Sequence, residues 1–260
     1  MLAFFVYKTK NQVSTQTRAN IQLCLPQLSA NHQEDLIFES IHQTSCAFFE
    51  LAVLWYQPIE KVLNLIKTKN IDNSFYDNDK SKIIIAPHQG SWELLNLWLA
   101  NEGTTYSLYK PAKSSSMDHY ILSKRTRNNA VLIPANTTGL RKLLIGLKNK
   151  ASCMILPDQR PAKNTAQINA MFFNKPAQTS LLIKRIAQKI DSNIYIATVT
   201  RNLTTSDFEL TVKALSRSEF LTEDLDSANY LNKSIENLIQ NNYAQYQWAY
   251  RRFSKNLYKK

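Results

Sequence analysis

The chain has few glycines and cysteines and lacks any long uninterrupted run of apolar residues. Its 260 residues include 4 glycines and 3 cysteines. Cys24, Cys46 and Cys153 are odd in number, far apart and without C-x-x-C spacing, so neither a disulfide framework nor a zinc site is indicated. A reducing compartment is the simplest interpretation, and each of the few glycines is expected at a turn or a close backbone contact.

The signals of membrane-spanning and secreted proteins are also missing. No apolar run approaches the ~20 residues that a transmembrane helix needs. The N-terminal "MLAFFVYKTK" has no basic region before its apolar residues and no small-residue cleavage site, so we expect no signal peptide. Attachment to a membrane surface through basic and aromatic side chains stays open as an alternative.

Positive charge, in contrast, is abundant. The 32 Lys and Arg residues outnumber the 20 Asp and Glu residues, which gives a formal net charge of +12. This balance favours anionic partners such as nucleic acid, phospholipid headgroups or phosphorylated substrates. Charge alone does not choose among these classes.

Strand and helix patterns alternate along most of the chain. A length of 260 residues with 44% hydrophobic content is sufficient for one domain with a substantial core. Apolar runs and periodicity predict strands at 83–86, 105–109, 131–133, 152–156, 193–200 and 208–214. Helices are predicted at 29–56, 59–67, 91–101, 116–127, 138–148, 177–190 and 223–240. We therefore expect a single α/β domain with a mixed, largely parallel sheet covered by helices. An N-terminal helical region, 1–82, would precede the α/β core, 83–260.

Four polar loops follow the first four predicted strands. In chain order they are "PHQGSWE", "YKPAKSSS", "PANTTG" and "PDQRPAKN". In open α/β sheets, ligands bind beyond the carboxyl ends of the strands. A functional site is therefore expected where these loops meet.

The stretch "APHQGSWELLNLWLA", residues 86–100, carries His88 and Glu93 on either side of Gly90. Residues five apart on one continuous helix point about 140° away from each other, so a joint role needs a break between them. A strand before Pro87, a turn at Gly90 and a helix after that turn supply the break. Glu93 would then lie in the first helical turn, where the positive helix end favours an ionised carboxylate, and it can orient His88 as a general base. The alternative is that His88 caps a loop and Glu93 is an ordinary first-turn acid.

The order of motifs resembles one known family, the late acyltransferases of lipid A biosynthesis, which add acyl chains to the lipopolysaccharide anchor. "PHQGSWELL" is similar to the H-x-x-x-x-E segment of that family, "YKPAK" to its Tyr-x-Pro loop and "KRTRNNAVLIP" to its basic segment. "ILPDQRP", "MFFNKPAQTSLL" and "AQYQWAYRRFSK" resemble its Pro-Asp-Gln, Phe-Phe-Gly-x-Pro-Ala-x-Thr and Gln-Tyr-x-Trp-x-His-Arg-Arg-Phe segments. The resemblance runs from about Arg18 to Lys255, with every motif in the family order. It implies a fold like that of glycerolipid acyltransferases.

The activity that the resemblance implies is transfer of a lauroyl or myristoyl chain from acyl carrier protein to a hydroxyl of a lipid A precursor, with no metal and no cofactor. Such a transfer needs a base for the hydroxyl and a donor that stabilises the tetrahedral oxyanion. We expect His88 to be the base and Glu93 to orient it. Arg127 is the expected cation, with Arg125 as the rival assignment. Direct transfer needs no Ser or Cys nucleophile, which agrees with the absence of a G-x-S-x-G motif.

Other matched segments imply contacts with substrate. Tyr109 lies in the Tyr-x-Pro loop, and Asp158 and Gln159 come directly after a predicted strand. For these last two an active-site wall, an acceptor contact and a structural role are all open. Near the C-terminus, we expect Arg251 and Arg252 to face phosphate or lipid headgroups, and the alternative is a solvated basic end.

Two further segments are expected to have structural roles. A helix entry is predicted at Asn174, Lys175, Pro176 and Thr179, because Pro176 suits a helix start and the following run is apolar. A C-terminal helix is expected to be packed by Trp248, Tyr250 and Phe253.

Several positions depart from the family pattern. Ser91 stands where Asn is usual, Gln89 where an aromatic residue is common, Asn174 where Gly is usual and Tyr250 where His is usual. A glycerophospholipid acyltransferase, with its H-x-x-x-x-D motif, is a second interpretation, against which Glu93 and the "QYQWAYRRF" ending argue. A third is a degenerate, non-catalytic relative that binds a membrane or nucleic acid through its basic surface.

The resemblance also implies the partners. Acyl carrier protein, a lipid A precursor and a membrane surface are expected, and nucleic acid is not. Members of the family begin with a membrane-spanning segment, whereas this sequence shows none. A displaced start, a trimmed sequence and peripheral binding are all open, and of these we expect peripheral attachment to the cytoplasmic face of the inner membrane.

Overall fold

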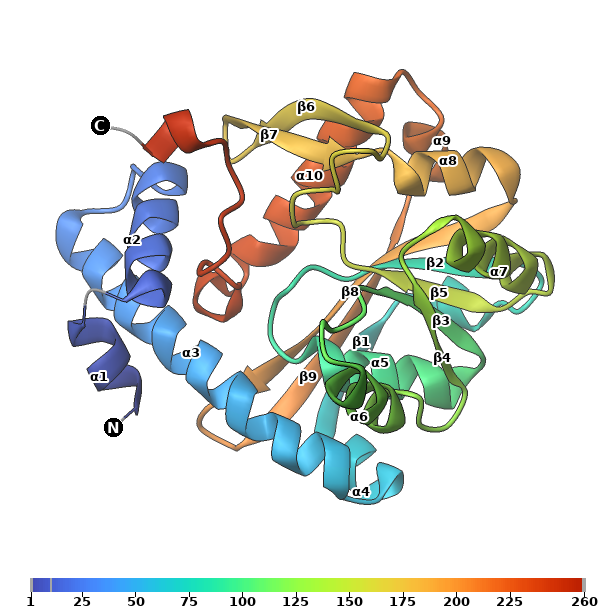
Figure 1. Ribbon diagram of the computed structural model, residues 1–260, viewed down its shortest axis with the longest axis horizontal. Coiled ribbons are helices and arrows are strands. Elements are labelled where there is room, and N and C mark those ends of the chain that lie inside the picture. Colours follow the sequence, from blue (N-terminus) through green and yellow to red (C-terminus); the bar gives the residue numbers. More distant parts are fainter. Residues whose placement is uncertain (1, 10, 259–260) are drawn as a thin grey trace.

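The computed structural model describes residues 2–9 and 11–258 and has a seven-stranded sheet at its centre (Figure 1). The strands lie in the order β1-β9-β8-β2-β5-β3-β4. Their bounds are β1 Ile66–Ile71, β2 Ser81–Ile85, β3 Thr105–Tyr109, β4 Ala130–Pro134, β5 Ser152–Ile155, β8 Ser192–Asn202 and β9 Asp207–Leu215. From β8 to β4 the strands run parallel, whereas β9 is antiparallel to β8 and β1 is parallel to β9. The predicted mixed, largely parallel sheet is thus confirmed.

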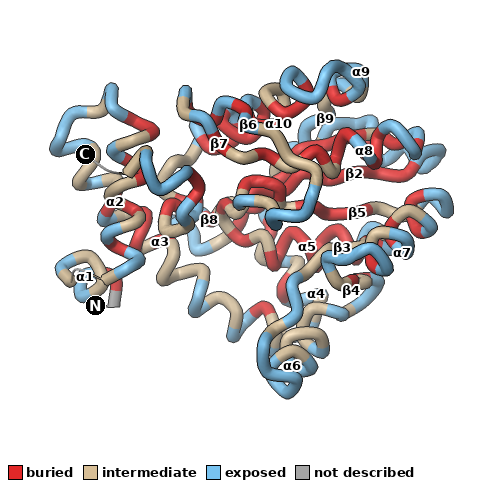
Figure 2. Tube along the Cα trace, turned by 45° about the horizontal axis from the view of Figure 1, so that its top comes forward, coloured by how far each residue is buried: buried red, intermediate tan, exposed pale blue. Residues whose placement is uncertain are grey.

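β2 lies between β8 and β5 and is buried along its whole length. Because successive side chains of a strand point to opposite faces, Ile83 and Ile85 belong to one hydrophobic cluster and Ile84 to the other. A run that is apolar on both faces is typical of a central parallel strand. Figure 2 shows the buried segments concentrated in the central strands and in α5 (Trp92–Glu102).

Helices pack on both faces of this sheet. α5 contributes to the cluster that contains Ile84, whereas α7, α8 and α10 contribute to the cluster of Ile83 and Ile85. The α-helices are α1 Leu2–Lys8, α2 Gln12–Cys24, α3 Ala30–Tyr56, α4 Ile59–Leu63, α5 Trp92–Glu102, α6 Ser115–Arg125, α7 Thr137–Lys148, α8 Leu182–Lys189, α9 Arg217–Phe220 and α10 Asp224–Gln240. Short 3₁₀ helices are η1 Asn73–Tyr76, η2 Tyr243–Gln245 and η3 Lys255–Tyr258.

The segment before α8 differs from the sequence prediction of a helix over 177–190. It forms an antiparallel hairpin, with β6 Gln167–Phe172 and β7 Lys175–Ser180. Phe173 and Asn174 make the turn with φ angles of 48° and 58°, a left-handed pair that matches the twist of a tight hairpin. Asn tolerates this conformation, so Asn174 is a turn residue and the predicted helix entry is wrong. The hairpin accommodates Pro176 because its sheet consists of β6 and β7 alone. The N–H that proline lacks is therefore not needed for a hydrogen bond to a third strand.

β1 is a second departure from the sequence prediction, which placed a helix over 59–67 and a polar loop after it. The helix α4 ends at Leu63, and β1 then joins the sheet beside β9. Four of its six residues are exposed, so the alternation that identifies a half-buried strand is missing. One strand of the sheet therefore lies inside the region 1–82 that was expected to be helical.

The N-terminal helices lie beside the sheet, and α2 contacts the C-terminal segment, residues 246–258 (Figure 1). In the part of the chain that the structure describes, no helix is both long and apolar enough to cross a bilayer. Asn20 of α2 donates side-chain hydrogen bonds to the carbonyls of Trp248 (2.6 Å) and Tyr250 (2.7 Å). Trp248 and Phe253 are buried as expected, but residues 246–254 form no helix, which corrects the prediction there. Their backbone bonds instead to neighbouring loops and to α2.

Candidate active site

The His88 loop begins directly after β2 and turns at Gly90, whose φ is +61°. A Cβ at this position would lie 2.1 Å from the carbonyl oxygen of Val199 in β8, so only glycine fits both the conformation and the space. The next residue, Ser91, donates its N–H to that same carbonyl at 2.7 Å. The loop is thereby fixed against the neighbouring strand before α5 begins.

Residues 242–247, which include η2, hold the other side of the same loop. Gly90 donates its N–H to the Gln245 carbonyl, and Gln247 donates its N–H to the His88 carbonyl, each at 2.9 Å. The Gln89 side chain also donates to the Asn242 carbonyl at 3.0 Å. The motif near the C-terminus therefore helps to build the site around His88, about 150 residues earlier in the sequence.

Asp158 is the carboxylate that contacts His88. Ile85 and Ile155 are register partners at the ends of the parallel strands β2 and β5, and His88 and Asp158 each lie three residues beyond them. The Nδ1 atom of His88 is 2.8 Å from Oδ1 of Asp158, and the backbone N–H of His88 donates to Oδ2 at 3.0 Å. Sequence analysis left the role of Asp158 open, because the equal offset from β2 and β5 becomes informative only when the strand order is known.

The electrostatics of this pair favour an ionised Asp158. Its side chain is only 2% exposed. Burial raises the pKa of a carboxyl group, but the charge of protonated His88 and the hydrogen bonds from it outweigh burial here, so the pKa of Asp158 is lowered. An ionised Asp158 is an acceptor only, and it therefore fixes the proton of neutral His88 on Nδ1.

The other ring nitrogen, Nε2 of His88, is 3.2 Å from the side-chain nitrogen of Gln159. With Nδ1 protonated, Nε2 accepts this hydrogen bond from the amide. The same Gln159 amide nitrogen is 3.3 Å from Oε1 of Gln247, which accepts from it. The basic nitrogen of His88 thus faces a polar side chain at the carboxyl ends of the strands, where a substrate hydroxyl can replace it.

Glu93 was predicted to orient His88, but in the structure it forms an ion pair with Arg125. It lies in the first turn of α5, as expected, but pairs with Arg125, whose Nε donates to Oε1 of Glu93 at 2.7 Å. Arg125 also stacks over the Trp92 ring, with 4.8 Å between the guanidinium carbon and the ring centroid. The pKa of Glu93 is raised, because burial outweighs the attraction to Arg125. Burial thus opposes the ionisation that the helix end was expected to favour.

Arg127 lies apart from this group. Its two terminal nitrogens donate to the carbonyls of Leu54 (2.5 Å) and Gln57 (2.6 Å) at the end of α3. A helix leaves its last carbonyls without intrahelical donors, and Arg127 supplies two. The geometry therefore gives Arg127 a role in holding α3 and favours the rival Arg125, which contacts Glu93, while the assignment of the cation stays a prediction.

The remaining predicted substrate contacts are spread over two regions. Tyr109 donates its hydroxyl to Asp118 of α6 at 3.4 Å. Arg251 is exposed and lies over the Tyr258 ring at 5.6 Å. Arg252 is buried, with 3% exposure, and the expectation that the two arginines face phosphate or lipid headgroups stays a prediction. The burial of Arg252 results from packing of the C-terminal segment against β7.

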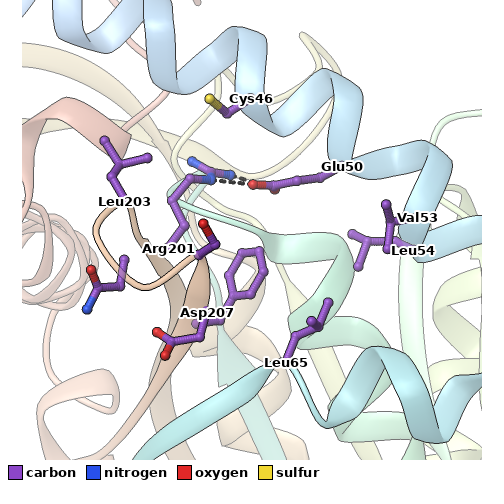
Figure 3. Close-up of a pocket in the computed structure, with 11 residues that line it drawn as sticks. Cys46, Glu50, Val53, Leu54, Leu65, Arg201, Leu203 and Asp207 are labelled. Atoms are coloured by element: carbon purple, nitrogen blue, oxygen red, sulfur yellow. Dashed lines mark hydrogen bonds and ion pairs between the residues drawn. The ribbon is translucent and has the colours of Figure 1, made fainter.

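Two cavities lie along α3, on the side that faces β8. A small one of about 50 Å³ lies beside His88 and includes Trp92 and Gln247 in its lining. A larger one of about 330 Å³ lies between α3 and the turn that joins β8 to β9 (Figure 3). Its walls are mostly apolar, with Val53, Leu65 and Leu203 among the lining residues.

Arg201 lines both cavities and forms an ion pair with Glu50, which lines the larger one. A second nitrogen of Arg201 donates to Glu50 at 2.7 Å, and Nη1 donates to the Gln43 side chain at 2.9 Å. The Arg201 side chain is 5% exposed. This bidentate pair ties α3 to β8, and sequence analysis missed it because its partners are about 150 residues apart.

Comparison with known proteins places this chain in a family. The chain matches the family described as bacterial lipid A biosynthesis acyltransferase over residues 1–255. It is 24% identical over 238 residues to the lipid A biosynthesis palmitoleoyltransferase of Escherichia coli (strain K12), and these residues make up 91% of this chain and 77% of that protein. A lipid A biosynthesis acyltransferase of Haemophilus influenzae is 20% identical over 239 residues, or 91% of this chain and 76% of the relative. The chain therefore belongs to the bacterial lipid A biosynthesis acyltransferase family.

Proposed function

We propose that this acyltransferase moves a fatty acyl chain from the thioester of acyl carrier protein to a hydroxyl of a lipid A precursor. The observation that carries the proposal is the contact of His88 with Asp158 at the carboxyl ends of β2 and β5. A histidine held by a buried carboxylate, with its second nitrogen accessible, is the arrangement that general-base catalysis requires.

In the proposed reaction, Nε2 of His88 takes the proton of the acceptor hydroxyl as its oxygen attacks the thioester carbonyl. Asp158 stabilises the imidazolium that forms. The tetrahedral intermediate then collapses, the C–S bond breaks, and the proton passes from His88 to the thiolate sulfur. An O-acyl ester and a free carrier thiol result, so atoms and charge balance.

No cysteine nucleophile is part of this scheme. Cys153 lies in β5 and is fully buried, and burial raises the pKa of its thiol to about 12. The thiolate, which is the reactive form, is therefore absent near neutral pH. Direct transfer between thioester and hydroxyl fits this environment better than an acyl-cysteine intermediate.

Gln159 and the Glu93–Arg125 pair are the proposed supporting groups. The acceptor hydroxyl would take the place of the Gln159 amide at His88, which frees that amide to donate to the developing oxyanion. Glu93 holds the Arg125 guanidinium against Trp92, whose ring centroid is 6.0 Å from that of His88. A fixed cation on this wall favours the negative transition state over the neutral ground state.

The acyl chain is proposed to lie in the larger cavity between α3 and the β8–β9 turn (Figure 3). Its volume of about 330 Å³ falls within the usual range of small-molecule sites, and its apolar walls suit a hydrocarbon. Lauroyl and myristoyl chains follow from the motif resemblance, whereas the relative from Escherichia coli carries palmitoleoyl in its name. Parallel assays with the three carrier thioesters decide among them.

Peripheral attachment to the cytoplasmic face of the inner membrane belongs to the same proposal. α3 exposes Phe48, Phe49 and Tyr56, with 67%, 61% and 63% of their surface accessible. Aromatic side chains on a basic protein of net charge +12 are suited to the interface of an anionic membrane. Val53, at the larger cavity, lies on the same helix and is 45% exposed, so this face would present the cavity to lipid.

The test is acyl transfer from lauroyl-, myristoyl- and palmitoleoyl-carrier protein to a radiolabelled lipid A precursor in detergent micelles. The wild-type protein is compared with His88→Ala. We expect transfer by the wild type and a loss of kcat of at least about 10²-fold in the variant. A cooperative unfolding transition should be retained, at a lower temperature because Asp158 loses its ring partner. Absence of transfer by the folded wild type with every donor, or equal rates for both proteins, contradicts the proposal.

A further inference from the structure

A third cavity, of about 200 Å³, lies outside the groups used above and has in its lining Arg160, the residue after Gln159. It is formed by the loop after β5, the β6–β7 hairpin and the C-terminal segment. We call it the two-arginine pocket; it is lined by Arg160, Asn169, Pro176, Gln178, Arg252 and Ser254. Both charged residues in this lining are cations.

Arg252 is a buried cation without a carboxylate partner. Within residues 2–9 and 11–258, no acidic side chain lies within 4.0 Å of its guanidinium nitrogens. Its terminal nitrogens donate to the Gln178 carbonyl (2.6 Å) and the Thr179 hydroxyl (3.2 Å), while Nε has no hydrogen-bond partner. A buried charge needs compensation, and a buried N–H without an acceptor is rare in native structures.

Arg160 approaches the same place from the loop after β5. Its Nη2 donates to the side-chain oxygen of Gln178 at 3.1 Å. The Tyr250 hydroxyl accepts from its backbone N–H, also at 3.1 Å. In the described part of the chain, Arg160 likewise forms no ion pair. Two guanidinium groups thus converge on Gln178 around a hollow that contains no acid, and they repel each other unless an anion lies between them.

The position of this pocket relates it to the proposed reaction. Arg160 directly follows Gln159, whose amide nitrogen is 3.2 Å from Nε2 of His88. An anion held by Arg160 would therefore lie on the same side of His88 as Nε2, the nitrogen that is proposed to take the proton of the acceptor hydroxyl. The planar fork of a guanidinium matches phosphate oxygens in pairs, and a phosphate group supplies enough acceptors for both arginines.

We propose that the two-arginine pocket binds a phosphate group of a substrate and so positions the reacting hydroxyl at His88. This inference rests on the proposed function. The phosphate can come from the sugar of the acceptor or from the prosthetic arm of the carrier protein. Both sources have the same recognition chemistry, and kinetics with modified substrates separates them.

The experiment compares wild type with Arg160→Gln and uses Lys163→Gln as the matched control. Arg160 is exposed and its side chain makes one hydrogen bond, so the substitution leaves the fold intact. Lys163 is an exposed cation in the same loop but does not line the pocket. Each protein is assayed with the phosphorylated acceptor, with the phosphatase-treated acceptor, and with an acyl-pantetheine donor that lacks phosphate.

If the acceptor supplies the phosphate, Arg160→Gln raises KM for the phosphorylated acceptor at least about tenfold, as expected for loss of one hydrogen bond to a charged group. KM for the phosphatase-treated acceptor stays unchanged, and so do all values for Lys163→Gln. If the carrier supplies it, the same difference follows the donor instead. Equal effects on substrates with and without phosphate, or no effect at all, overturn the proposal.

A second measurement does not depend on turnover. Inorganic phosphate, compared with chloride at equal ionic strength, should raise the melting temperature of wild type and Lys163→Gln but not of Arg160→Gln. If wild type transfers no acyl group yet shows this difference, the proposed function fails while the anion site stands. If phosphate stabilises all three proteins equally or none of them, the pocket is no phosphate site.

Discussion

Replacing Asp158 with Asn tests which carboxylate acts on His88. Asp158 contacts the ring, whereas Glu93 is near His88 in the sequence but pairs with Arg125. The carboxylate of Asp158 accepts from both Nδ1 of His88 (2.8 Å) and its backbone N–H (3.0 Å). An amide of the same shape has only one oxygen. If that oxygen keeps the backbone N–H, the amide NH₂ faces Nδ1, which must then accept, so the ring proton moves to Nε2. His88 then has no free nitrogen for the substrate proton.

The magnitude follows from the burial of the pair. A hydrogen bond to a charged group contributes about 1.5–3 kcal/mol, and a 2% exposed carboxylate has little water to weaken it. Loss of about 3 kcal/mol of transition-state stabilisation corresponds to a rate reduction of about 150-fold. We therefore expect Asp158→Asn to lower kcat by up to about 10²-fold with little change in KM, because the interaction strengthens as the imidazolium forms.

Steady-state transfer assays are combined with ¹⁵N NMR of the imidazole, which reports the tautomer directly. Glu93→Gln is the matched control, because its side chain contacts Arg125 and not His88; it should leave the tautomer unchanged. The reasoning is refuted if Asp158→Asn retains kcat within about threefold of wild type, or if Nε2 of His88 stays unprotonated in that variant.

The same substitution changes the dependence of stability on pH. Because the folded pKa of Asp158 is lowered, its contribution is complete above the unfolded value of about 3.9. The contribution is lost as pH falls through the lower folded pKa, since the unfolded chain then binds the extra proton. Acid unfolding curves of wild type should therefore fall more steeply below about pH 4 than those of Asp158→Asn, which has no such group to titrate. Parallel curves would contradict the lowered pKa.

Two further predictions concern α3 and the cavity beneath it. Arg127→Met should lower the free energy of unfolding by about 1–3 kcal/mol, since it removes two hydrogen bonds to helix-end carbonyls, yet it should change kcat of the folded protein by less than about fivefold. Chemical denaturation and kinetics check this, and a kcat loss above about 10²-fold without destabilisation would restore Arg127 as the catalytic cation. Leu203→Trp should fill the larger cavity, of which Leu203 is a half-exposed lining residue. A myristoyl chain has two methylenes more than a lauroyl chain, and each excluded methylene is worth about 0.8 kcal/mol. The ratio of kcat/KM for the myristoyl donor to that for the lauroyl donor should therefore fall about 15-fold, and an unchanged ratio means that the acyl chain binds elsewhere.

The hairpin before α8 illustrates where sequence patterns were insufficient. Its turn depends on the left-handed conformations of Phe173 and Asn174, and Phe is not a residue type that signals such a turn. β1 was missed for a different reason, because its exposed residues show no alternation and its ladder is supplied by β9. In both cases a partner strand, rather than local preference, decided the structure.

The central strands, the single α/β domain and the position of the site were determined by the sequence itself. Apolar runs such as Ile83–Ile85 mark strands that are buried on both faces, and polar loops after them mark the binding edge. Gly90 was likewise identifiable as a turn, since glycine is rare in this chain. Local spacing is enough for these inferences, because they depend on periodicity and on the conformations available to single residues.

Which side chains meet at that edge was decided only by the tertiary structure. Glu93 is five residues from His88 yet pairs with Arg125, while Asp158, 70 residues away, contacts the ring. The physical reason is strand order: β5 lies beside β2 in the sheet although two other strands come between them in the sequence. A carboxylate at the end of β5 is therefore brought to His88 by parallel register, whereas the helix that begins after Gly90 carries Glu93 away from it.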